Sequence, residues 1–150
     1  MNANELLYGI YVYFNCFDGS KITVKVTGFK DGVVYGVSEH GSHWCNIRKV
    51  EPIPLTAEIL EQNGFEKIKI AYTFNKYRYL CSLKKNRVFI DCIPYSNENL
   101  IVPNWFGVQV VENELDAQAH LNSSCTIPCA YVHELQKALS ICKIKKTIEL

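Results

Sequence analysis

Apolar and polar residues alternate with a period of two along much of the first fifty residues, which predicts short β-strands. The alternation is clearest in LYGIYVYFNCF (7–17) and KITVKVT (21–27), and VVYGVS (33–38) and HWCNI (43–47) continue it. Asp18-Gly19 and Asp31-Gly32 are typical hairpin turns between such strands. Closely connected short strands of this kind predict a small SH3-like β-barrel over residues 1–51.

The pattern changes at a connector that contains Pro52 and Pro54. LTAEILEQNGF (55–65) then predicts a short helix, with Thr56 as its N-terminal cap and Asn63-Gly64 at its end. We therefore place the domain boundary here, with a first domain of residues 1–51 and a second of residues 52–150.

The second domain is predicted to be an antiparallel meander covered by a helix. Segments in which apolar and polar residues alternate occur at KIKIAYTF (67–74), YRYLCSL (77–83) and RVFIDCI (87–93), and GVQVV (107–111) is a plausible fourth strand. A helix from about Pro128 to Cys142 has apolar residues at helical spacing, with His133 on its polar side, and we expect it to cover the apolar face of the sheet. The fold class is thus α+β.

Composition indicates a folded protein of the cytoplasm. The chain is 48% hydrophobic and 21% charged, and it has neither an eighteen-residue apolar run nor a basic segment followed by an apolar one at its start. Its seven cysteines are odd in number and several lie between apolar residues of predicted strands, so we interpret most of them as small buried hydrophobic residues.

Two stretches resemble a group of small uncharacterised proteins encoded by phages and prophages of gut bacteria. They are PIPLTAEILEQNGF (52–65) and YVHELQKAL (131–139), and the similarity weakens in the middle of the chain and after Gln136. The resemblance implies a phage or mobile-element setting in the cytoplasm of a bacterial host, and the same two-part layout. It assigns no catalytic residue.

The segment EHGSHWC (39–45) has residue types that bind zinc. His40, His43 and Cys45 could join Cys125 and Cys129 in a tetrahedral site, but the spacings differ from those of familiar zinc sites. We favour a polar hairpin loop and a strand with Trp44 packed on the barrel rim, and expect no metal.

Evidence for catalysis is weak. Any of the cysteines could be paired with any of the four histidines as nucleophile and base, and nothing selects one pair. Glycine-rich phosphate loops and the common hydrolase motifs are absent from the sequence. We therefore predict no enzymatic activity and no cofactor, and keep a zinc- or cysteine-dependent enzyme as an alternative.

Charge is unevenly distributed although the net charge is only +1. Residues 66–90 carry seven basic residues against Glu66. Basic side chains interleaved with aromatic rings can bind nucleic acid or nucleotides. The candidate residues for this alternative function are Lys67, Lys69, Arg78, Lys84, Lys85, Arg87, Tyr77 and Tyr79.

Protein binding is the function that the sequence favours. Small β-barrels of this kind are commonly docking modules, and exposed aromatic residues are enriched at the centres of protein interfaces. The opposite charges of residues 66–90 and 91–120 also suggest a route to a homo-oligomer. The candidate protein-binding residues are Tyr11, Tyr13, Trp44, Trp105 and Phe106.

Overall fold

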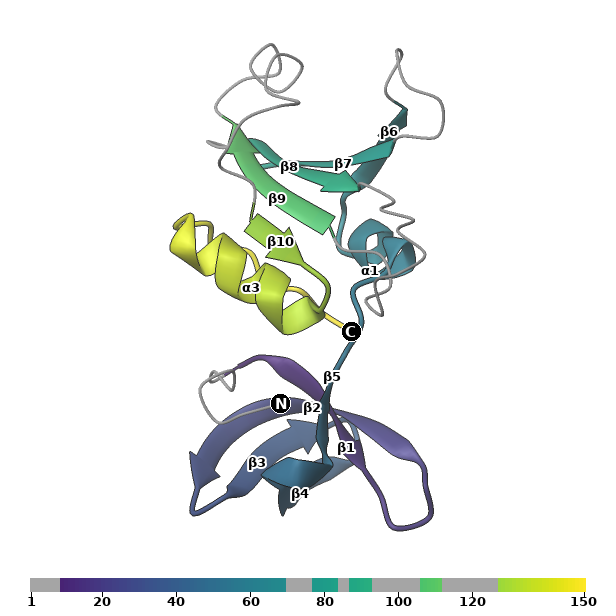
Figure 1. Cartoon of the computed structure of the whole chain (residues 1–150), viewed down its shortest axis with the longest axis vertical. Helices are drawn as coiled ribbons and strands as arrows, with labels where there is room; N and C mark the ends of the chain where they lie inside the picture. The colour runs from purple at the N-terminus through teal and green to yellow at the C-terminus, as the bar shows by residue number, and fades with distance from the viewer. Residues whose placement is uncertain (1–8, 70–76, 84–86, 93–105, 112–126) are drawn as a thin grey trace, which may run out of the picture. The chain divides into compact units, whose positions relative to one another are not determined.

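The structure is a computed structural model that describes residues 9–69, 77–83, 87–92, 106–111 and 127–150. It divides the chain into two compact units, Met1–Pro54 and Leu55–Glu149, which are taken separately below (Figure 1). The division lies in the two-proline connector, a few residues after the predicted boundary.

The N-terminal unit is a five-stranded antiparallel sheet. Its strands are β1 (Tyr11–Asn15), β2 (Lys21–Lys30), β3 (Val33–Ser38), β4 (Gly41–Asn46) and β5 (Val50–Pro52), and a 3-10 helix, η2 (Ile47–Lys49), precedes the last. The strand order is β4-β3-β2-β1-β5. Asp31 and Gly32 both have positive φ, 51° and 78°, which is the conformation that a two-residue hairpin between β2 and β3 requires.

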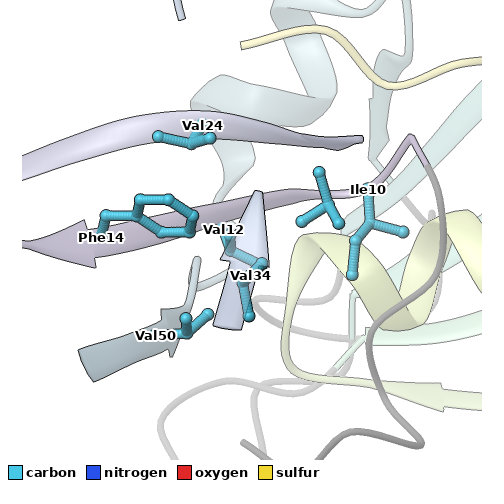
Figure 2. Close-up of a cluster of buried hydrophobic side chains, with 7 residues drawn as sticks. Ile10, Val12, Phe14, Val24, Val34 and Val50 are labelled. Atoms are coloured by element: carbon cyan, nitrogen blue, oxygen red, sulfur yellow. The ribbon is translucent and has the colours of Figure 1, made fainter. Parts of the chain in front are cut away.

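One face of this sheet carries the hydrophobic core of the unit. Figure 2 shows how the side chains from β1, β2, β3 and β5 gather there. The cluster consists of Ile10, Val12, Phe14, Val24, Val26, Val34 and Val50. Strict alternation therefore separates an apolar face from a face that carries Tyr11, Tyr13 and the lysines of β2.

The predicted SH3-like barrel is not confirmed. Strands β4 and β5 are the two ends of the sheet, and no pairing between them is present among the described residues. The coarser prediction, a mostly β chain with antiparallel sheets and a C-terminal helix, is confirmed.

The second unit combines another five-stranded antiparallel sheet with two helices. The helices are α1 (Ala57–Gln62) and α3 (Val132–Ile141), and the strand order is β10-β9-β8-β7-β6. The strands are β6 (Glu66–Lys69), β7 (Tyr77–Ser82), β8 (Arg87–Cys92), β9 (Phe106–Val111) and β10 (Ile127–Cys129). Helix α3 lies beside β10, and α1 lies near β6 (Figure 1).

Helix α1 has the predicted ends. The Thr56 hydroxyl accepts a hydrogen bond from the Ile59 amide at 3.3 Å, and Gly64 has a φ of 76° just after the helix. The first amide groups of a helix have no hydrogen-bond partner within the helix. The Thr56 side chain supplies such a partner, which explains why the helix begins at Ala57.

Helix α3 begins later than predicted. Pro128 lies in β10, which pairs with β9, so the helix cannot include it. The Glu134 carboxylate instead accepts hydrogen bonds from the amides of Ala130 (2.6 Å) and Tyr131 (3.2 Å) and thereby fixes the start at Val132.

A C-terminal tail, residues 143–149, completes the second unit. Ile144 and Ile148 are buried, and the Gln136 side chain bonds to both the Lys146 carbonyl (3.0 Å) and the Ile148 amide (2.9 Å). Asn63, at the end of α1, bonds in the same way to both backbone groups of Glu149. Two amide side chains thus hold a segment that has no regular secondary structure.

Candidate binding surface

The face of the N-terminal sheet opposite its hydrophobic core carries exposed aromatic and aliphatic side chains of β3 and β4. We call it the solvent face and define it by the residues Tyr11, Tyr13, Lys21, Lys25, Tyr35, Val37 and Trp44. Trp44 is 71% exposed, Tyr35 44% and Val37 40%. Large apolar groups held in water by a rigid sheet are the usual sign of an interaction surface.

Strand register places these side chains next to one another. Tyr35 on β3 pairs directly with Trp44 on β4, so the two rings lie on neighbouring strands and on the same face. One step along the sheet, Val37 pairs with Lys25, which in turn pairs with Tyr11 on β1. The surface therefore runs continuously from β4 to β1.

Basic groups border the aromatic rings. The ammonium group of Lys25 lies 5.2 Å from the centre of the Tyr11 ring, and that of Lys21 lies 5.8 Å from the centre of the Tyr13 ring. Both distances are within the range of cation–π attraction, which orients the lysine side chains along the rings. The solvent face is thus aromatic with a basic border.

Glu51 balances part of this charge. Its carboxylate accepts hydrogen bonds from Lys21 Nζ and, at 2.8 Å, from Asn15 Nδ2. These two bonds, that from Lys21 first, lower the pKa of Glu51 below its ordinary value. Lys21 is therefore already engaged, which reduces its contribution to binding an anion.

The protein-binding residues predicted from the sequence fall into three groups. Tyr11, Tyr13 and Trp44 lie together on the solvent face, and the expectation that Trp44 packs on a barrel rim is wrong. Phe106 was expected to be exposed, but it is 3% exposed and packs edge-on against Tyr79 with ring centres 6.4 Å apart. Trp105 lies outside the described residues.

The basic meander, by which we mean residues 66–90, is described only in part. Lys67 is exposed on β6. Tyr79 is almost fully buried, so its ring cannot stack on a base as the sequence suggested. Lys84 and Lys85 lie outside the described residues, and the structure gives only the backbone of Lys69, Tyr77, Arg78 and Arg87.

The two histidines and the cysteine of EHGSHWC are not grouped around a metal position. His43 and Cys45 lie on the same face of β4, as their spacing predicts, but His43 Nε2 is hydrogen-bonded to the Ser38 hydroxyl at 2.8 Å. His40 lies in the turn beside Glu39, with 3.3 Å between its Nε2 and the carboxylate. Among the described residues no three histidine, cysteine or acidic side chains could hold a metal ion, and Cys125 is not among them.

The described cysteines differ in burial. Cys81 and Cys129 are buried, as the sequence indicated, whereas Cys16, Cys45 and Cys142 are partly accessible. Burial, with a smaller effect of Glu134, raises the pKa of Cys129 to about 12, and burial also raises the pKa of Cys45. A thiol with a raised pKa is a poor nucleophile because the thiolate is the reactive form.

His133 differs from the prediction. It was expected on the polar side of the last helix, but it is buried at 8% exposure and its ring stacks on that of Tyr131, with centres 5.7 Å apart. Helical spacing alone could not have found this, because His133 lies in the first turn, where its ring stacks on the N-cap residue Tyr131.

Comparisons with protein-family models, with curated proteins and with solved structures gave no match to this chain. Within the described residues, no helix has both the length and the apolar character that crossing a membrane requires. The functional argument therefore rests on the residues themselves.

Proposed function

We propose that the protein is a non-enzymatic binding protein that docks on another protein through the solvent face. The observation that carries this is the exposed Trp44, held beside Tyr35 by strand register on a rigid sheet. Tryptophan and tyrosine contribute most strongly to binding when a partner removes them from water, because each buries a large apolar area with little loss of side-chain freedom.

The proposed partner is a protein of a bacterial host. This part of the proposal comes from the resemblance of residues 52–65 and 131–139 to phage and prophage proteins. In that setting the chain acts in the host cytoplasm as an accessory protein, and inhibition of a host defence system is one form that its action could take.

We further propose that the N-terminal unit is SH3-like. A meander of four strands, a 3-10 turn at Ile47–Lys49 and a short last strand that pairs with β1 support this proposal. Small units of this architecture commonly serve as docking modules, which is an analogy at the level of fold.

The experiment is capture from host lysate with the purified chain as bait. Trp44→Ala and Tyr35→Ala should lose the captured protein, since each removes an exposed ring from the solvent face. Phe17→Ala is the matched control, because Phe17 is 99% exposed but lies in the turn between β1 and β2. Equal capture by all three variants would show that docking uses another surface.

A second candidate function is binding of single-stranded nucleic acid. Lysines over tyrosine rings on a sheet face, as Lys21 and Lys25 are, are also found where bases stack and phosphates pair with cations. Treating the lysate with nuclease separates the two functions: capture that survives nuclease supports the protein partner. Replacing three basic residues with glutamate, Lys84→Glu, Lys85→Glu and Arg87→Glu, tests the basic meander in the same assay. This variant should leave protein docking intact.

A further inference from the structure

Strand β4 is an open edge of the N-terminal sheet. It pairs with β3 over its whole length, Gly41–Asn46, without a bulge. On its other side no strand pairs with it in the part of the chain that the structure describes. An edge strand presents backbone donors and acceptors that can bind a further strand.

The hydrogen-bond pattern identifies the backbone groups at this edge. The Ile47 amide donates to the Gly32 carbonyl at 2.9 Å, next to the register pair Val33 and Asn46. Bonded and non-bonded pairs alternate along an antiparallel ladder, so the pair of Tyr35 with Trp44 is a non-bonded one. The amide and carbonyl groups of Ser42, Trp44 and Asn46 therefore point away from β3.

Two of these three residues offer both groups. The Asn46 carbonyl is already engaged, because Asn46 is the N-cap of η2 and its carbonyl accepts the first hydrogen bond of that helix, and the Cys45 thiol donates a weak one at 3.2 Å. The edge thus has three donors, from Ser42, Trp44 and Asn46, and two acceptors, from Ser42 and Trp44, at alternate positions, which is the spacing that an added antiparallel strand needs.

Strand β4 lacks the features that usually protect an edge. Its sequence, GSHWCN, has no proline, no lysine or arginine and no acidic residue. The opposite edge, β5, is different: it has three residues, and two of them are Glu51 and Pro52. Pairing is therefore blocked at one edge of the sheet and open at the other.

We propose that β4 pairs with β4 of a second copy of this chain, in an antiparallel arrangement centred on Trp44. A two-fold axis perpendicular to the sheet keeps the solvent faces of both copies on the same side. Because side chains alternate between the two faces along a strand, the residues that oppose each other must both have even numbers or both have odd numbers. Trp44 then opposes Trp44 of the second copy, and Ser42 opposes Asn46. In this register all three outward-pointing residues fall in hydrogen-bonded pairs.

The character of β4 favours a second copy as the occupant. Antiparallel pairing of identical strands is self-complementary, and the absence of charged residues removes the repulsion between like charges that would oppose it. Because β5 is protected, the pairing closes after two copies and does not extend into a filament. The dimer joins the two solvent faces into one, with the two indoles side by side. This inference does not rest on the proposed docking function.

A cross-link tests the register directly. His43 opposes Cys45 of the second copy in a non-bonded pair, whose Cα atoms are about 4.5 Å apart, within the range that a disulfide spans. Under mild oxidation His43→Cys should form a covalent dimer whose mapped disulfide joins residues 43 and 45. Val37→Cys, on the same sheet but one strand inward, should not form that product.

Sedimentation equilibrium from micromolar to millimolar concentration gives the second readout. The wild-type chain should be a dimer, and Trp44→Lys, which sets two ammonium groups against each other, should be a monomer. Val37→Lys places the same charge on the solvent face away from the edge and should stay dimeric. A monomeric wild type, a Trp44→Lys dimer, or a dimer that His43→Cys does not cross-link would each overturn the proposal.

Discussion

The Leu55 amide donates a hydrogen bond to the Ala130 carbonyl at 2.9 Å. This bond joins the connector before α1 to the segment before α3. Leu55 is buried, and the next residue, Thr56, caps α1. The start of α1 is therefore tied to the segment before α3, although strands β6 to β10 lie between them in the sequence.

Gly36 on β3 should tolerate no side chain. A Cβ there would lie 2.7 Å from the Lys25 carbonyl oxygen and would clash with the Val24 side chain. We expect Gly36→Ala to lower the free energy of unfolding by about 1–3 kcal/mol, since the strand or the core must shift. Chemical denaturation of the wild type and the variant measures this difference in the free energy of unfolding.

Gly28→Ala is the control for that variant. Gly28 lies on β2, has no atom near the position of an added Cβ, and has an ordinary φ. A change as large as that of Gly36→Ala would mean that loss of glycine, and not the clash, determines the effect.

The C-terminal tail should contribute strongly to stability through Ile148. This side chain is fully buried. Ile148→Ala should cost about 2–5 kcal/mol, because it removes buried methyl groups and leaves a cavity. Ile141→Ala, at 62% exposure, should change thermal and chemical unfolding little. Equal effects would show that the tail is not packed in solution as described.

The thiol of Cys129 should resist alkylation in the folded protein. Burial raises its pKa to about 12, so near pH 8 almost none of it is thiolate. Iodoacetamide followed by peptide mapping should label Cys16 well before Cys129, and unfolding in guanidinium should make their rates similar. Rapid native labelling of Cys129 would reopen the possibility of a cysteine nucleophile.

Glu51 should make stability depend on pH in the acid range. Its pKa is lowered in the folded state by Lys21 and Asn15, so the ionised form contributes stability above its unfolded pKa. This contribution is lost as the pH falls through the folded pKa. The difference in stability between wild type and Glu51→Gln should therefore be present at neutral pH and shrink below about pH 4. A difference that grows on acidification would contradict this assignment.

Periodicity predicted the elements well where one face of a strand is apolar and the other polar. KITVKVT became β2 with Val24 and Val26 inside, and the signals at Thr56 and Gly64 located α1 closely. It could not predict the environment of Trp44, because β4 has too few apolar residues to indicate which face is buried.

The parts that the sequence did not predict depend on contacts between distant residues. Strand β10 has three residues and a proline, so it forms only because β9 supplies its hydrogen bonds. The tail has no helical or strand pattern and is held by Gln136 and Asn63. The candidate surface was predicted for Tyr11, Tyr13 and Trp44, while the inclusion of Tyr35 and Val37 needed the register of β3 with its neighbours.

The tail also bears on the order in which the molecule can form during translation. The N-terminal sheet is complete once β5 has left the ribosome, so it can fold early. The second unit differs, because Gln136 and Asn63 bind backbone groups as far along as Glu149. Its buried surfaces stay open until synthesis reaches that point, and the first unit can therefore meet a partner before the second has finished folding.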